Sequence, residues 1–219
     1  MSDEPRSEPM TFMYRLALRL LTPYVRWWGR MEVSGLEHMP LTGPVLLAGN
    51  HDSYWDPVAI GIAALPRRQI RALAKSSLWK PGLGKVLDGM GQIPIERGKG
   101  DAHAMDRAIA ELRGGACIGI FPEGTRSKGR ELRARSGFGR LAAEVPEAQV
   151  VCVAVAGTVD LSRFPTRPRV TVRFFVPEGG GLQPGESPAD LAARLLAQTR
   201  ALAPIVAAGR RRREPAPTV

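Results

Sequence analysis

The chain has 219 residues, a length that suits one domain and at most two. Because 44% of the residues are hydrophobic, it can build a substantial core, which excludes a disordered tail or a low-complexity scaffold. Its 31 Lys and Arg residues outnumber the 21 Asp and Glu residues and give a formal net charge of +10. Such a surface favours polyanions, meaning nucleic acid, an anionic membrane face or phosphorylated substrates. The two cysteines, Cys117 and Cys152, lie in apolar runs and are expected to be buried thiols.

The N-terminal 30 residues begin polar and then become amphipathic. The first nine are polar and partly acidic, unlike the basic start of a secretory signal. Between residues 10 and 30, four arginines interrupt an apolar stretch, which therefore falls short of the roughly 18 apolar residues of a spanning helix. Arginines combined with Trp, Tyr and Leu are typical of a helix lying in the plane of a membrane surface. The alternative is an amphipathic helix docked on its own domain. The residues expected to contact lipid are Phe12, Arg15, Arg19, Trp27 and Trp28.

Beyond residue 30, short apolar runs alternate with helical patterns. The six expected strands cover residues 45–48, 70–74, 92–95, 116–121, 150–156 and 171–176. The expected helices cover residues 57–65, 78–87, 101–113, 137–145 and 187–208, the last with Ser187 as its N-cap. This alternation predicts an α/β fold, a single domain with a mostly parallel sheet flanked by helices. We expect a docking segment over residues 1–30, the domain over 31–209 and a basic disordered tail over 210–219.

The first segment with candidate catalytic residues follows the strand expected at residues 45–48. It contains His51 and Asp56, and Pro57 follows directly, which predicts that Asp56 caps a helix. A turn leading into this cap would bring Asp56 back to the imidazole of His51. A carboxylate that fixes the imidazole tautomer makes such a pair a general base. The alternative is that Asp56 only caps the helix and His51 only closes a turn.

Two further segments leave strands at the same predicted sheet edge. Residues 121–127 combine a glycine turn with two hydroxyls and Arg126, which together can cradle a phosphate. Arg97 and Lys99 follow the strand that ends near residue 95. Together, the His51–Asp56 pair acting as a general base and several cations at one sheet edge indicate a phosphorylated substrate whose hydroxyl group is to be activated.

These motifs, in this order, resemble the glycerolipid acyltransferases, in particular the bacterial 1-acylglycerol-3-phosphate O-acyltransferases. The resemblance covers about residues 30 to 160 and rests on NHDSYWD at 50–56, GQIPIER at 91–97, FPEGTRS at 121–127 and the strand ending in Gly-Thr at 151–158. It implies that His51 and Asp56 are catalytic. It also implies a set of residues that bind the substrate's phosphate and glycerol: Lys75, Arg97, Glu123, Gly124, Thr125, Arg126 and Ser127.

The resemblance implies that His51 deprotonates the free sn-2 hydroxyl of lysophosphatidic acid, which attacks an acyl thioester to give phosphatidic acid. Glu123 would bind a glycerol hydroxyl or, in the preferred interpretation, fix Arg126. Acyl-CoA or acyl-acyl carrier protein would be the co-substrate, with no metal and no other cofactor. Because these lipids reside in the bilayer, we expect peripheral, monotopic binding to the cytoplasmic face of the cell membrane.

Two alternatives remain at this point. Within the family, the acceptor can be glycerol 3-phosphate, another lysophospholipid or a glycolipid, because the motifs constrain the chemistry more than the acceptor. A basic nucleic-acid-binding protein would also explain the net charge of +10, but it calls for aromatic residues interleaved along a basic stripe. The aromatic residues here cluster at Trp27-Trp28 and Tyr54-Trp55 instead, so we expect no nucleic-acid partner.

Overall fold

The computed structural model describes residues 9–96 and 101–206, and a seven-stranded sheet forms the centre of this part of the chain. The strand order is β1-β7-β6-β2-β5-β3-β4, and neighbouring strands are parallel except for the antiparallel pair β6 and β7. The strands are β1 (Glu32–Ser34), β2 (Val45–Gly49), β3 (Ile70–Lys75), β4 (Ile93–Ile95), β5 (Cys117–Ile120), β6 (Gln149–Ala156) and β7 (Thr171–Phe175).

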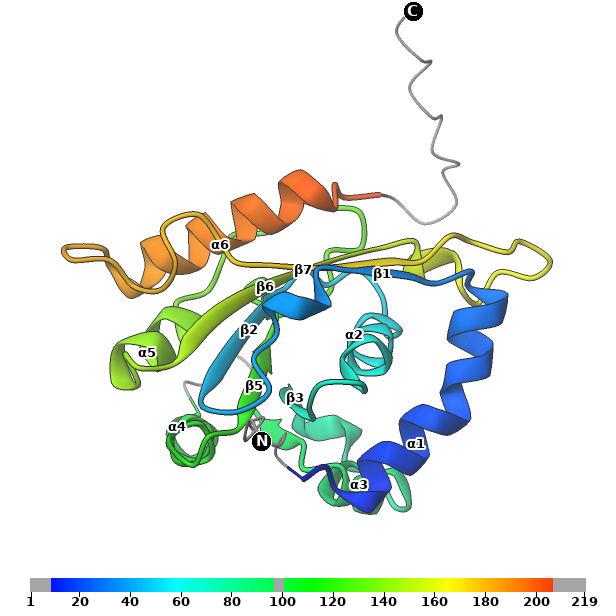
Figure 1. The fold of residues 1–219 in the computed structure, drawn as a ribbon, viewed down its shortest axis with the longest axis horizontal. Coiled ribbons are helices and arrows are strands. Elements are labelled where there is room, and N and C mark those ends of the chain that lie inside the picture. The colour runs from blue at the N-terminus through cyan, green and yellow to red at the C-terminus, as the bar shows by residue number, and fades with distance from the viewer. Residues whose placement is uncertain (1–8, 97–100, 207–219) are drawn as a thin grey trace, which may run out of the picture.

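Helices cover both faces of the sheet. Figure 1 shows α1 and α2 on one side and α4, α5 and α6 on the other, which makes three layers. The α-helices are α1 (Phe12–Pro23), α2 (Asp56–Ala64), α3 (Leu83–Gly89), α4 (Ala102–Arg113), α5 (Gly137–Glu144) and α6 (Pro188–Leu202). Short helical turns are η1 (Tyr24–Trp28), η2 (Leu36–His38), η3 (Ser76–Leu78) and η4 (Thr158–Asp160).

The sheet separates two apolar cores, and β2 contributes to both. Val45 and Leu47 pack into the core beneath α1 and α2, whereas Leu46 and Ala48 pack into the core beneath α4, α5 and α6. This division follows from the period-two alternation of side chains along a strand. A central strand buried on both faces is apolar at every position, which explains why the run at residues 45–49 is so easily recognised in the sequence.

The predicted α/β architecture is confirmed, and the six predicted strands all form within one or two residues of their expected bounds. β1 was not predicted, because a three-residue edge strand has no apolar run. The helix predicted over residues 78–87 begins only at Leu83, after Pro81-Gly82. Ser187 caps α6 as expected, since its side chain accepts a hydrogen bond from the Asp190 N–H. α6 ends at Leu202 rather than at residue 208, and the basic run 210–213 lies outside the described residues.

The N-terminal segment is helical from Phe12 to Trp28. A proline inside a helical pattern predicts a break at Pro23, but the helix continues past it as the π-helical turn η1, in which the Gly29 N–H donates to the Tyr24 carbonyl. Tyr14 and Leu18 are buried against the domain. None of the helices in the described part of the chain has the length and apolar character needed to cross a membrane.

Candidate active site

The polar residues of the candidate site converge where β2, β5 and β6 end. These three strands are parallel neighbours, so their carboxyl ends share one edge of the sheet. His51 comes two residues after β2, Glu123 three residues after β5, and Thr158 two residues after β6. The topology therefore brings together residues more than 100 positions apart in the chain.

His51 and Asp56 form a buried pair. The imidazole Nδ1 of His51 lies 3.0 Å from Oδ2 of Asp56, and both side chains are almost inaccessible to solvent. Because a carboxylate oxygen can only accept, this contact places the proton of a neutral imidazole on Nδ1 and leaves Nε2 to take a proton. The ring of His51 also stacks on Phe121, with centroids 4.2 Å apart and planes inclined by 14°. The pairing predicted from the His-x4-Asp spacing is therefore present.

Asp56 is held by more contacts than the sequence suggested. Its Oδ2 also accepts hydrogen bonds from the backbone N–H groups of Asp52 and Ser53, at 2.6 and 2.7 Å, while Oδ1 accepts from the hydroxyl of Thr158. The prediction that Asp56 is the N-cap is wrong by one position, since Trp55 is the cap and Asp56 is the first residue of α2. The carboxylate reaches back to the turn before the helix, and the positive end of the helix dipole stabilises its charge.

Thr158 is a site residue that the sequence analysis did not single out. The signal for it in the sequence is the Gly-Thr pair at the end of β6. Gly157 has φ +83°, and a Cβ at this position would lie 2.1 Å from the Arg169 carbonyl oxygen. A glycine is therefore required to turn the chain here and deliver Thr158 to Asp56.

The peptide groups on both sides of His51 are held by the loop that follows β5. The His51 N–H donates to Oε2 of Glu123 at 2.7 Å, and the His51 carbonyl accepts from the Ser127 N–H at 2.7 Å. The Ser127 hydroxyl donates to Asp52. Glu123 and Ser127, which the resemblance assigned to substrate binding, therefore use their polar groups to hold the loop that carries His51. The structure does not show the preferred interpretation that Glu123 fixes Arg126. Glu123 is buried, and its two oxygens accept hydrogen bonds from the His51 N–H and from Arg200 instead.

The second oxygen of Glu123 accepts from Arg200 of α6, whose guanidinium also bonds to both oxygens of Asp52. Burial raises the pKa of Glu123 above its usual value, although the hydrogen bonds from Arg200 oppose this shift. Burial would also raise the pKa of Asp52, but hydrogen bonds from Arg200 and Ser127 outweigh it, so the pKa of Asp52 is lowered. The sequence analysis did not identify Arg200, which lies more than 40 residues beyond the last of the motifs.

An apolar cavity of about 490 Å³ opens beside His51 and extends to α1. Buried aliphatic and aromatic groups of Tyr14, Leu18 and Leu47 line its interior. Its lining also includes more exposed polar side chains, and these contain three cations. The cations are Lys75 from the end of β3 and Arg126 and Lys128 from the loop after β5, and Thr125 in the same loop adds a hydroxyl. Lys75, Thr125 and Arg126 were predicted, whereas Lys128 was not.

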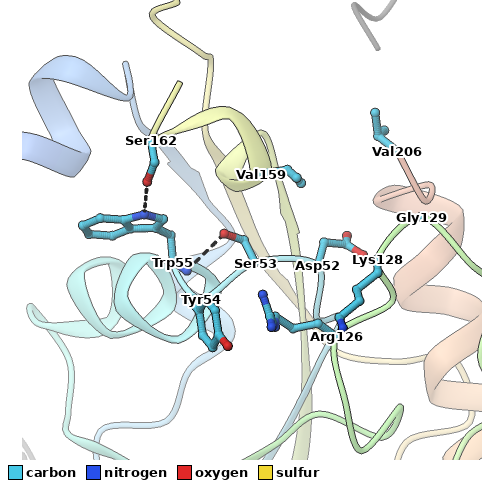
Figure 2. A pocket seen from close by; sticks show the side chains of 10 residues that line it. All are labelled: Asp52, Ser53, Tyr54, Trp55, Arg126, Lys128, Gly129, Val159, Ser162 and Val206. Atoms are coloured by element: carbon cyan, nitrogen blue, oxygen red, sulfur yellow. Dashed lines mark hydrogen bonds between the residues drawn. The ribbon is translucent and has the colours of Figure 1, made fainter. Parts of the chain in front are cut away.

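A second hollow of about 320 Å³ adjoins the first and shares Tyr54, Arg126 and Lys128 with it. Figure 2 shows Arg126 beside Tyr54, with the guanidinium carbon 3.5 Å from the ring centroid. A cation held over an aromatic face in this way is attracted by the ring's electrons and is restrained in position. Trp55 is fixed by a 2.7 Å hydrogen bond to Ser162, also drawn in Figure 2.

The remaining predictions concern Arg97, Lys99, a metal ion and Gly124. Arg97 and Lys99 fall outside the described residues, so the structure places neither of them. Across residues 9–96 and 101–206, no group of three His, Cys, Asp or Glu side chains is arranged to hold a metal ion. Gly124, the remaining predicted residue, has φ +69°, and a Cβ there would lie 2.5 Å from Arg135 Cδ.

A buried His–Asp pair at the mouth of an apolar cavity, with cations beside it, has the chemical groups that an enzyme needs to take a proton from a bound substrate. Comparison with known proteins narrows this class. The model of the Acyltransferase family matches residues 30–156, which contain His51, Asp56 and the loop after β5. The chain belongs to the Acyltransferase family.

Individual relatives agree with this assignment. The chain is 40% identical over 108 residues to a 1-acyl-sn-glycerol-3-phosphate acyltransferase of Borreliella burgdorferi, a match that covers 48% of this chain and 42% of the relative. It is 36% identical over 142 residues to a lyso-ornithine lipid O-acyltransferase of Pseudomonas aeruginosa, covering 60% and 52%. The chain thus spans about half the length of these relatives.

The fold has a counterpart among solved structures. The crystal structure of the 1-acyl-sn-glycerophosphate (LPA) acyltransferase of Thermotoga maritima superposes with a TM-score of 0.57 at 19% identity, covering 86% of this chain and 79% of that one. At this identity the likeness establishes the fold, a mostly parallel sheet flanked by helices.

Proposed function

We propose that the protein transfers a fatty acyl group from an acyl thioester to the sn-2 hydroxyl of lysophosphatidic acid, giving phosphatidic acid. The observation that carries this proposal is the buried pair of His51 and Asp56 beside an apolar cavity whose lining includes Lys75, Arg126 and Lys128. A long acyl chain suits the apolar part, and a phosphate suits the cations. The names of several relatives specify acyl transfer to the same acceptor, 1-acyl-sn-glycerol-3-phosphate.

In the proposed reaction, His51 acts as the general base. Its Nε2 takes the proton of the acceptor hydroxyl while that oxygen attacks the thioester carbonyl and forms the new C–O bond. The C–S bond then breaks, and the imidazolium returns the proton to the departing thiolate, so that atoms and charge balance. Asp56 fixes the imidazole tautomer through the 3.0 Å contact and stabilises the imidazolium. Holding both substrates side by side supplies much of the rate.

The acceptor's phosphate would bind among the cations of the cavity. Arg126 is the strongest candidate, because a guanidinium forms paired hydrogen bonds with phosphate oxygens and Tyr54 restrains it. Thr125, Lys75 and Lys128 would add a hydroxyl and two further charges. Arg97 remains a proposed contributor on the basis of the sequence alone.

Acceptor choice is the finer part of the proposal, because one relative is named for a lyso-ornithine lipid rather than for lysophosphatidic acid. The test is product analysis by mass spectrometry with an acyl-CoA donor and separate acceptors: lysophosphatidic acid, glycerol 3-phosphate, lyso-ornithine lipid and monoacylglycerol. We expect phosphatidic acid as the main product. Arg126→Gln should raise the KM for lysophosphatidic acid about tenfold or more while changing kcat less. Equal use of monoacylglycerol would contradict phosphate recognition.

We also propose that the outer face of α1 and η1 binds the membrane surface from which the lipid is drawn. Phe12 and Trp27 are 70% and 72% exposed, although they are large and apolar. Phe164, which is 83% exposed, stacks on Trp28, and Arg167 lies 5.0 Å from the Trp27 ring centroid. Arg15 and Arg19 are exposed on the same helix and would meet lipid phosphates.

Flotation with liposomes tests this surface. We expect binding to phosphatidylglycerol-containing vesicles that weakens in Trp27→Ser and in Phe164→Ser, and weakens further in high salt because the arginines contribute. Leu132→Ser, a change at a half-buried position of another loop, is the control and should bind as the wild type does. Unchanged flotation of both aromatic variants would contradict the proposed surface. Retention on neutral vesicles in high salt would show that charge is not the main attraction.

A further inference from the structure

Arg200 connects the C-terminal helix α6 to the loop that carries His51. It lies in the last turn of α6, far from the segment matched by the family model, which ends at residue 156. We propose that Arg200 is a positioning residue for His51, acting through the carboxylates of Glu123 and Asp52. This inference rests on the proposed function for its kinetic test, but its structural test is independent of the substrate.

The guanidinium contacts both carboxylates at once. Its Nη1 and Nη2 donate to the two oxygens of Asp52, each at 2.9 Å, which is a bidentate pair. Its Nε and Nη2 also donate to Oε1 of Glu123, at 3.1 and 2.5 Å. Each carboxylate then acts directly on the catalytic loop, because Glu123 Oε2 accepts the His51 N–H and Asp52 is the residue after His51.

These contacts are buried, so removing Arg200 would have a large effect on the two carboxylates. The side chains of Arg200, Asp52 and Glu123 are 13%, 9% and 1% exposed, so water screens their charges only weakly. Without the guanidinium, two adjacent carboxylates would be left in a poorly hydrated space. Either one would take up a proton or the loops would separate, and each response would disturb the acceptor of the His51 N–H.

Apolar contacts, rather than Arg200, attach α6 to the sheet. α6 is fixed to the sheet by Leu191 and Leu195, which belong to the apolar core beneath α4, α5 and α6. Arg194, six residues earlier on the same helix, makes an equally dense set of contacts with Glu186 and with the carbonyls of Glu178 and Gly181. Those contacts hold the loop before α6 and do not reach His51, so Arg194 is a matched control.

The kinetic experiment compares Arg200→Gln, Arg200→Lys and Arg194→Gln with the wild type. Misplacement of a catalytic group by about 1 Å can cost about 100-fold in rate, so we expect Arg200→Gln to lower kcat by about 10- to 100-fold with a smaller change in the KM for lysophosphatidic acid. Arg200→Lys should recover part of kcat, since it restores the charge but not the paired hydrogen bonds. Arg194→Gln should retain wild-type kcat even if its melting temperature falls.

The structural experiment uses NMR of histidine labelled with ¹⁵N, since the chain contains only three histidines. With His51 assigned from a His51→Ala variant, Arg200→Gln should shift the backbone amide and ring nitrogen signals of His51, and Arg194→Gln should leave them in place. If the wild type transfers no acyl group to lysophosphatidic acid, the proposed function fails while this measurement still decides the role of Arg200. Unchanged His51 signals and unchanged kcat in Arg200→Gln would overturn the proposal, as would loss of folding in both Arg200 variants while Arg194→Gln folds.

Discussion

Asp56→Asn separates the charge of the proposed catalytic pair from its geometry. Three donors, the His51 Nδ1–H and the N–H groups of Asp52 and Ser53, all reach the same oxygen, Oδ2. Within residues 9–96 and 101–206, the other oxygen, Oδ1, has a single hydrogen-bond partner, the Thr158 hydroxyl, which can rotate from donor to acceptor. An asparagine can therefore place its carbonyl at Oδ2 and its NH₂ at Oδ1 without breaking a contact.

The expected magnitudes follow from this geometry. The imidazole keeps its tautomer, but the imidazolium formed in the reaction loses the adjacent negative charge. General-base assistance contributes about 10²- to 10⁴-fold, so we expect kcat to fall by about 100-fold or more, equivalent to about 2.7 kcal/mol on the barrier. A hydrogen bond to a charged acceptor contributes about 1 kcal/mol more to the free energy of unfolding than one to a neutral acceptor. Each kcal/mol of stability shifts the melting temperature of a chain of this size by about 2–4 °C. The variant should therefore fold and melt several degrees lower.

The assay is release of CoA thiol at saturating lysophosphatidic acid, with thermal melting measured on the same preparations. Thr158→Ser is the control, because it keeps the hydroxyl that meets Asp56 and should remain within a few-fold of wild-type kcat. If Asp56→Asn keeps more than about a fifth of wild-type kcat while His51→Ala is inactive, the charge of Asp56 plays no part in catalysis and the residue only shapes the turn.

Three further predictions test the loop, the cavity and the buried charges. Gly124→Ala forces a Cβ into a backbone with φ +69° and against Arg135, so it should lower both kcat and the melting temperature. Gly137→Ala is the control: it meets open space at the start of α5, so it should leave kcat unchanged and should not lower the melting temperature. Ala72→Leu adds volume to the lining of the cavity and should shift the preference, measured as kcat/KM across a series of acyl-CoA lengths, toward shorter chains; Ala110→Leu on the exposed surface of α4 should leave the profile unchanged, and an unchanged profile in Ala72→Leu would place the acyl chain elsewhere. Because the pKa of Asp52 is lowered in the folded protein, the stabilisation from this group is complete above the ordinary carboxyl pKa of about 4 and is lost as the pH falls through the lowered value. Urea unfolding between pH 7 and pH 3 should therefore show a smaller loss of stability in Asp52→Asn than in the wild type.

The fold was largely predictable from the sequence, for a physical reason. Central strands such as β2 are buried on both faces, so they appear as continuous apolar runs. β1 lacks this signal, because Glu32 and Ser34 are exposed at the edge of the sheet. The continuation of the N-terminal helix beyond Pro23 was also missed, since a π-helical turn depends on packing around Val25 that no local pattern reveals.

The candidate site was predictable only in part. The short spacing between His51 and Asp56 made their contact foreseeable, because a turn and a helix start lie between them. The roles of Glu123 and Arg200 were not, since they depend on a contact across 77 residues that the sheet order creates. A sequence motif records that Glu123 is present, but it does not distinguish a side chain that binds substrate from one that holds the His51 peptide.

The central claim is that His51 activates the acceptor hydroxyl for attack on an acyl thioester. The most direct measurement is thiol release from a long-chain acyl-CoA, with and without lysophosphatidic acid, for the wild type and for His51→Ala. We predict release that requires the acceptor and that disappears in the variant. Release that is independent of the acceptor would indicate a thioesterase, and acceptor-dependent release that persists in His51→Ala would contradict the role assigned to this histidine.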